Sequence, residues 1–224
     1  LIPAQYFGLR QYGAVAPGYA ADLIIISDLN DFRVESVYKN GILVAEKGRV
    51  FKPSKLSIDN NCFPRVTESF NMAEIKIDDL NLKENGKNER VICLTDNEVL
   101  TYEKIVPLRQ NTGTACGVDV ENKILKIAVF ERHNNLGHVG LGFLGNYGLK
   151  CGAVASSIAH DSHNLLVAAT NDADMVLAGN TVRKNKGGLA FVVNGQVIGE
   201  LALPIAGLMS TENAEAVEKK VQLL

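Results

Sequence analysis

Two Asn-Gly dipeptides constrain the fold of this chain most, because each stands between two short apolar runs. They are Asn40-Gly41 and Asn194-Gly195. A type I′ turn needs a positive φ at both central residues, which Asn and Gly adopt at low cost. Each dipeptide therefore predicts a β-hairpin with antiparallel flanking strands. Those strands are residues 32–38, 42–45, 189–193 and 196–201.

The rest of the chain mixes further short strands with two helices. A helix is predicted over residues 171–186, and a second over residues 211–224 with Ser210 or Thr211 as its N-cap. Residues 23–26 are β-branched and predict a buried strand. The predicted fold class is α+β. The other short apolar runs are residues 91–94, 99–100, 124–130, 154–158 and 165–169, with residues 83–89 as a polar hairpin tip.

Composition places the chain among globular proteins. It has 224 residues, 46% hydrophobic and 21% charged, which fits one or two domains of about 150 residues. Its net charge is −2, so no positive field exists to hold nucleic acid or an anionic membrane. No apolar run approaches the roughly 18 residues of a membrane span. We expect a soluble chain with neither nucleic acid nor membrane as a partner.

The cysteines are widely spaced, and none forms the Cys-x-x-Cys pair that is typical of zinc and redox sites. No signal peptide is recognisable at the start of the chain. We therefore expect reduced thiols and a cytoplasmic location. The four cysteines are Cys62, Cys93, Cys116 and Cys151.

The two ends and one internal segment indicate how the chain is organised. It opens on Leu1 without a Met and closes within a predicted helix, so we expect part of a longer protein. Residues 47–59 are polar and contain Gly and Pro, which predicts a linker. A second domain is expected to begin near Asn60.

The densest polar cluster is the run His160-Asp161-Ser162-His163-Asn164, which lies between two apolar segments. Burying such groups without partners costs about 1 to 3 kcal/mol each, so something must satisfy them. In one interpretation, the two histidines and Asp161 face a metal or a substrate. In the other, the run is a turn whose groups bond one another between two buried strands.

A second cluster follows the strand predicted to end at Phe130. It consists of Glu131-Arg132-His133 and the later His138. Strand ends often present functional groups, but a solvated loop explains the same residues.

Residues 140–145 match the Gly-x-Gly-x-x-Gly dinucleotide fingerprint, and Asp161 follows at the distance of a ribose-binding acid. The fingerprint requires the glycines to open a helix, whereas further glycines keep interrupting this segment. We interpret the match as a decoy and the glycines as close-packed turns. The chain contains no P-loop, Gly-x-Ser-x-Gly, His-Glu-x-x-His or zinc base deaminase pattern. No complete catalytic apparatus is visible.

Residues 16–26 read Ala-Pro-Gly-Tyr-Ala-Ala-Asp-Leu-Ile-Ile-Ile, and residues 37–48 read Val-Tyr-Lys-Asn-Gly-Ile-Leu-Val-Ala-Glu-Lys-Gly. Together they resemble the C-terminal segment of metal-dependent amidohydrolases, whose strands complete a small β-sandwich after a TIM barrel. Residues 3–9 are similar to the closing helix of that barrel.

Later motifs resemble the C-terminal domain of bacterial and archaeal adenine deaminases. They are residues 131–133, 140–143, 155–164, 170–175 and 203–210. The resemblance implies an amidohydrolase β-sandwich segment followed by a mixed α/β C-terminal domain, with the TIM barrel missing. It divides the chain into residues 1–12 as the tail of the barrel's closing helix, residues 13–54 as the sandwich segment, and residues 55–224 as the C-terminal domain, incomplete at its end.

For function, the resemblance implies hydrolysis of adenine to hypoxanthine and ammonia in purine salvage, with manganese or iron held in the barrel. A bound metal activates the attacking water. The barrel's metal ligands have no counterpart here, so the chain alone is expected to be inactive and no metal is assured in it. We also expect a homo-oligomer. The alternatives are another amidohydrolase or a non-catalytic interaction module. The site candidates are His160, Asp161, His163 and Asn164.

Overall fold

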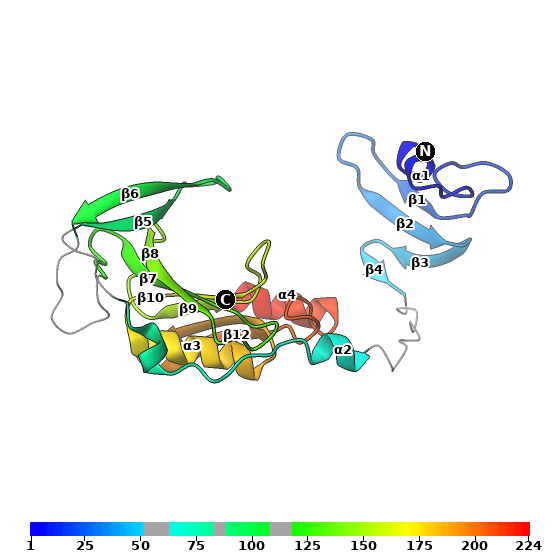
Figure 1. Cartoon of the computed structure of the whole chain (residues 1–224). Coiled ribbons are helices and arrows are strands. Elements are labelled where there is room, and N and C mark those ends of the chain that lie inside the picture. Colours follow the sequence, from blue (N-terminus) through cyan, green and yellow to red (C-terminus); the bar gives the residue numbers. More distant parts are fainter. Residues whose placement is uncertain (52–62, 83–87, 108–117) are drawn as a thin grey trace. The chain divides into compact units, whose positions relative to one another are not determined.

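A computed structural model of the chain describes residues 1–51, 63–82, 88–107 and 118–224 (Figure 1). The contacts divide the chain into two compact units, Leu1–Ser57 and Ile58–Leu224. Each unit is described by itself below. The predicted α+β class is confirmed, since both sheets and helices form.

The first unit is a short helix followed by a four-stranded antiparallel sheet in the order β1-β2-β3-β4. The predicted hairpin at Asn40-Gly41 is confirmed, and both residues have positive φ, 49° and 77°. The Asp22 carboxylate accepts the N–H of Asn40 at 2.8 Å and supports the turn. The elements are α1 (Ile2–Tyr6), β1 (Leu23–Ile26), β2 (Val34–Lys39), β3 (Ile42–Glu46) and β4 (Arg49–Val50).

The first unit buries very little of its apolar surface. The prediction of a buried strand at β1 was wrong, because Ile24 and Ile25 are 50% and 51% exposed. Among residues 1–51, only Ala4 and Ser36 are buried. A sheet buries a face only against a second layer, and within residues 1–51 no such layer forms. Within the predicted linker, residues 47–59, the structure forms strand β4 at residues 49–50, so the linker prediction was wrong there. Residues 52–59 lie outside the described part of the chain.

The second unit contains an eight-stranded sheet in the order β12-β11-β9-β10-β7-β8-β5-β6. Neighbouring strands are antiparallel, except that β5 pairs with β8 in parallel. The predicted strands at residues 124–130 and 165–169 are confirmed, as is the Asn194-Gly195 hairpin between β11 and β12. The strands are β5 (Asn88–Leu94), β6 (Thr101–Pro107), β7 (Ile124–Phe130), β8 (Val139–Gly145), β9 (Ala153–Ser156), β10 (Leu165–Ala169), β11 (Gly188–Val193) and β12 (Gln196–Ala202).

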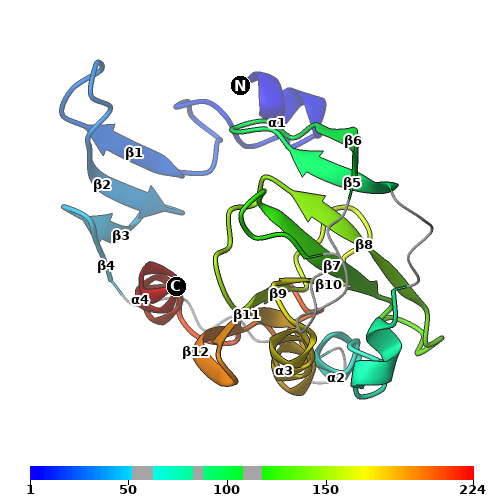
Figure 2. The same ribbon diagram turned by 90° about the vertical axis from the view of Figure 1, so that its left-hand side faces the viewer.

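Helix α3 (Asp172–Lys184) covers one face of this sheet, as Figure 2 shows. The predicted helix is confirmed: the side chain of Asn171 caps it by accepting the N–H of Asp174 at 2.8 Å. Its buried face packs against alanines and valines of the central strands, which give a dense core. The core includes Met175, Ala178, Val182, Ala153, Ala155, Val167 and Ala190.

Two local predictions in the second unit were wrong. Residues 99–100 lie in the exposed turn of the β5–β6 hairpin rather than in a strand. Helix α4 (Ala214–Leu223) is capped by Asn213, whereas Ser210 caps a local turn by accepting the N–H of Glu212.

The remaining short helices are α2 (Phe63–Thr67) and η1 (Ile77–Leu80). Most of the expected hairpin tip at residues 83–89 lies outside the described residues.

The Gly-x-Gly-x-x-Gly match lies within strand β8, so the interpretation as a decoy agrees with the structure. The prediction that these glycines form turns was wrong, because residues 140–145 belong to the strand. A Cβ on Gly145 would lie 2.7 Å from the Cys93 sulfur, so this glycine allows β5 and β8 to pack closely. Within the described part of the chain, no helix has the length and apolarity that crossing a membrane requires.

Asp174 is buried beneath the β11–β12 turn and accepts the N–H groups of Asn194 and Gly195 at 3.2 and 2.7 Å. Replacing it with Ala leaves both donors without a partner, so we expect Asp174→Ala to cost about 3 kcal/mol of unfolding free energy, measured by urea denaturation. The matched control Asp78→Ala removes an exposed carboxylate and should cost under about 0.5 kcal/mol. Equal losses would show that the turn does not depend on Asp174.

The poor burial of the first unit makes a second prediction. In dilute solution, amide hydrogens of β2 and β3 should exchange about a hundredfold faster than those of β7 and β10, measured by hydrogen exchange. Protection that rises with protein concentration would indicate pairing or packing with another copy. Slow exchange in a monomer would contradict the view that this sheet needs another layer.

Candidate functional site

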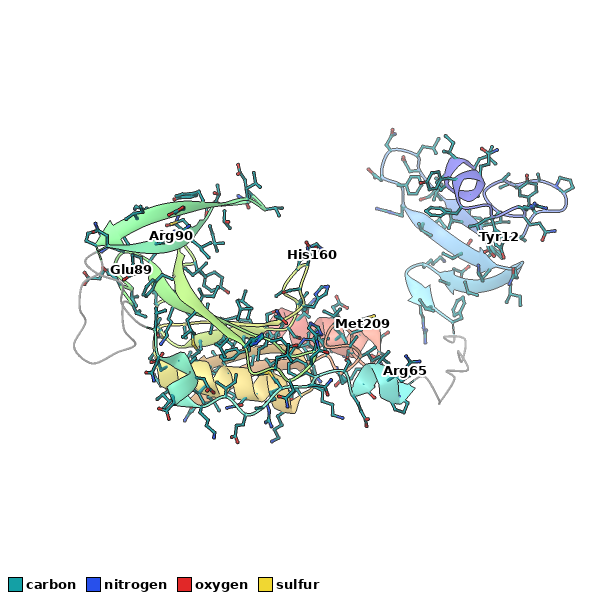
Figure 3. The ribbon with its side chains drawn as sticks, in the orientation of Figure 1. Tyr12, Arg65, Glu89, Arg90, His160 and Met209 are labelled. Carbon is teal, nitrogen blue, oxygen red and sulfur yellow. The ribbon has the colours of Figure 1, made fainter. Side chains whose placement is uncertain are left out.

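The predicted polar cluster forms the loop that joins β9 to β10. His160 and Asp161 stand at its tip, and their side chains are 86% and 92% exposed. The His160 Nδ1 lies 2.8 Å from a carboxylate oxygen of Asp161. Figure 3 shows His160 projecting from the loop, away from the helix-covered face of the sheet. At the tip, the two side chains therefore pair with each other and face solvent.

The second half of the loop turns back toward the sheet. His163 has a positive φ of 49°, and its N–H donates to the Ala159 carbonyl at 2.5 Å. The rings of His160 and His163 meet edge to face, with centroids 6.1 Å apart. The Nδ1 of His163 and the Oδ1 of Asn164 are buried and find no hydrogen-bond partner among the described residues.

The two polar clusters seen in the sequence meet in the structure. Arg132 donates from Nε to the His163 carbonyl at 2.5 Å, and His133 Nε2 lies 2.8 Å from the Ser162 carbonyl, to which it can donate. Asn71 fixes this segment in turn, since its backbone N–H donates to the Arg132 carbonyl at 2.7 Å. The residues after β7 thus hold the loop between β9 and β10.

Arg132 also binds a third segment, residues 203–210. Its Nη2 donates to the Ala206 carbonyl at 3.0 Å, and its guanidinium lies 4.8 Å from the centre of the Phe70 ring. A Cβ on Gly207 would come within 2.8 Å of the guanidinium, so a larger residue there would require Arg132 to shift. The Ser157 hydroxyl donates to the Gly207 carbonyl at 2.6 Å and completes the junction.

Arg132 is only 1% exposed, and burial lowers the pKa of its guanidinium. No ion pair to it forms among the described residues. Its Nη1 is the third buried side-chain atom without a partner in that part of the chain, beside His163 Nδ1 and Asn164 Oδ1. Buried polar atoms in native proteins are nearly always bonded. The three exceptions all belong to this junction.

Glu131 shapes the turn that follows β7. Its carboxylate accepts the backbone N–H groups of His133, Asn134 and Leu136 at 2.6, 2.7 and 2.9 Å. These hydrogen bonds, chiefly those from Leu136 and Asn134, lower the pKa of the carboxyl group. His138 does not join the junction. It is exposed and lines a small cavity of about 190 Å³ with Glu131 and Lys76.

The structure shows no metal centre in the part of the chain that it describes. No group of three or more His, Cys, Asp or Glu side chains is arranged to hold an ion there. The metal interpretation of His160, Asp161 and His163 stays a prediction. Cys93 and Cys151 are free thiols, whereas Cys62 and Cys116 lie outside the described residues.

Sequence reasoning missed several residues that build the junction. Phe70, Asn71 and Ser157 carried no chemical signature, and residues 203–210 were noticed only as a family motif. Phe70 contacts Arg132 through its ring, and Asn71 and Ser157 bond to backbone carbonyls, which every sequence offers. Only Gly207 gave a signal, since a glycine between apolar residues often marks a close approach.

The lowered pKa of Glu131 makes a testable prediction. Its folded pKa lies below the ordinary 4.5, so the stabilisation is complete above that value and is lost as pH falls through the lowered pKa. Between about pH 5 and about pH 3 the unfolding free energy of Glu131→Gln should therefore fall less steeply than that of the wild type, measured by denaturant titration. Glu68→Gln, at an exposed site, is the control and should follow the wild type. Identical slopes for Glu131→Gln and wild type would contradict the prediction.

Comparisons with known proteins give the family. The model of the adenine deaminase C-terminal domain matches residues 98–224. The adenine deaminase of Desulfatibacillum aliphaticivorans is 41% identical over 221 residues, which is 99% of this chain and 38% of that protein. Adenine deaminase 2 of Carboxydothermus hydrogenoformans is 40% identical over 223 residues, again 99% of this chain and 38% of the relative.

A third relative, the adenine deaminase of Kosmotoga olearia, is 39% identical over 219 residues, 97% of this chain and 37% of that protein. The chain thus spans little more than a third of the length of these relatives. The identity extends over almost all of the chain, including residues 1–97, which precede the matched domain. The chain belongs to the adenine deaminase family.

Proposed function

We propose that this chain is the C-terminal part of an adenine deaminase that hydrolyses adenine to hypoxanthine and ammonia in purine salvage. The observation that carries the proposal is the identity of about 40% to proteins named adenine deaminase along nearly the whole chain. The junction around Arg132 supports it, because residues 131–133, 155–164 and 203–210 are motifs that resemble this family.

The proposed division of labour gives the metal to another part of the protein. A divalent ion, manganese or iron, would supply an activated water at neutral pH. We assign this ion to the amidohydrolase barrel that the resemblance implies for the whole protein. Among the described residues of this chain, no three-ligand cluster for such an ion is found. In this proposal residues 1–12 end the closing helix of the barrel, residues 13–54 belong to a β-sandwich, and residues 55–224 form the C-terminal domain. A cytoplasmic homo-oligomer is part of the same proposal.

This chain's own contribution is the loop between β9 and β10. His160 and Asp161 form a paired, exposed tip that can contact substrate or another part of the protein. His163 and Asn164 keep one polar atom each without a partner among the described residues. We propose these four residues as the polar groups that the domain adds to the site.

One observation favours a second function, that of an interaction module. The first unit exposes many apolar side chains, among them Ile24, Ile25 and Ile42. Large exposed apolar patches mark surfaces that meet another protein surface. The two functions are compatible, since a β-sandwich segment of a larger enzyme would bury the same side chains.

The test compares two purified proteins, this chain alone and the chain joined to the barrel of its full-length protein. With adenine and manganese, the full-length protein should release ammonia and the chain alone should not, because the ligands of the activating metal lie outside it. Turnover by the chain alone at an enzymatic rate, about 1 per second or faster, would overturn the assignment of the metal to the barrel. A full-length protein without activity on adenine would overturn the proposed function.

A further inference from the structure

The loop between β9 and β10 is held chiefly through its backbone. Arg132 reaches the His163 carbonyl with Nε and the Ala206 carbonyl with Nη2, so one guanidinium fixes two segments. The carbon at the centre of the guanidinium lies 4.8 Å from the centre of the Phe70 ring. Lysine offers a compact ammonium that can neither bond in this forked manner nor stack in the same way.

The junction is not the arrangement that stability alone would favour. A buried charge without a counter-ion is costly, and three buried polar atoms there lack partners among the described residues. Two of those atoms, His163 Nδ1 and Asn164 Oδ1, belong to the loop itself. Asn164 Oδ1 accepts a hydrogen bond and His163 Nδ1 can donate one. Each atom thus keeps a hydrogen-bonding capacity that none of the described residues uses.

We propose that Arg132 is a positioning residue, which fixes residues 157–164 so that this loop presents its polar groups to the substrate of the proposed enzyme. The inference rests on the function proposed above. Arg132 does not touch the substrate in this proposal: it acts through the carbonyl oxygens of His163 and Ala206. Its removal should therefore disturb the loop and the activity more than the global fold.

A first experiment needs only this chain. In Arg132→Lys, the N–H of His163 should exchange about tenfold faster than in wild type, since losing one charged hydrogen bond costs about 1.5 kcal/mol or more. Arg183→Lys is the matched control, because Arg183 also donates from Nε to a backbone carbonyl, that of Met72 at 3.1 Å, but on helix α3. It should leave exchange in the loop unchanged. Equal exchange in both variants would overturn the positioning role.

A second experiment uses the full-length protein with adenine. Arg132→Lys should lower kcat/KM about tenfold while its melting temperature stays close to that of Arg183→Lys, which should keep wild-type kinetics. His163→Ala should also lower kcat/KM. The double variant that combines it with Arg132→Lys should have a kcat/KM no lower than that of the less active single variant. Non-additivity of this kind shows that Arg132 acts through the loop. Losses that multiply in the double variant would overturn the proposal.

Two further arms keep the result decisive. If Arg132→Lys does not fold, Phe70→Leu removes the ring beneath the guanidinium and should produce the same pattern of faster loop exchange and lower kcat/KM; wild-type behaviour of this variant would overturn the proposal. If wild-type full-length protein does not deaminate adenine, the proposed function fails. The loop exchange measured on this chain still decides whether Arg132 positions the loop.

Discussion

A buried guanidinium bonded to backbone carbonyls is the interaction on which the rest of the site depends. Arg132 follows β7, His163 lies after β9, and Ala206 lies after β12, so the three segments are far apart in sequence. Each carbonyl would lose hydrogen bonds to water on burial, and Arg132 replaces those bonds. Because the arginine has no acidic partner among the described residues, backbone dipoles and the Phe70 ring are what stabilise its charge.

The core beneath this junction explains why it stays in place. Small side chains on the central strands let α3 approach the sheet closely, and Gly179 on the helix faces Ile75, whose side chain would be 2.4 Å from an added Cβ. Asn180 holds the same segment by exchanging two hydrogen bonds with the backbone of Ile75, at 3.0 and 2.9 Å. The chain that leads from Phe70 to η1 is thus clamped along α3. Phe70 and Asn71 are therefore held beneath Arg132.

The sequence was informative where structure follows from short segments. Both boundaries of strand β7 were predicted, because its apolar run is long. The Asn194-Gly195 hairpin was predicted because its turn favours those two residues. The N-cap of α4 was misplaced, since Ser210, Thr211 and Asn213 all have capping side chains. The exposure of Ile24 could not be foreseen, because burial depends on a second layer and not on the strand itself. The contact between the two polar clusters was also not predicted. It runs from the side chains of Arg132 and His133 to backbone carbonyls, which are the same in every residue type.

The length of the loop between β9 and β10 separates what the fold needs from what the site needs. Strand β9 ends at Ser156 and β10 begins at Leu165, so residues 157–164 form the loop. In the same sheet, Asn194-Gly195 alone joins β11 to β12, which shows that a two-residue connection suffices for adjacent antiparallel strands. Lengthening a loop costs little entropy, but this one also requires a buried arginine to hold its carbonyls. The sheet needs neither the extra length nor the buried arginine, so both would be explained by a use for the polar groups that the loop carries, residues 160–164.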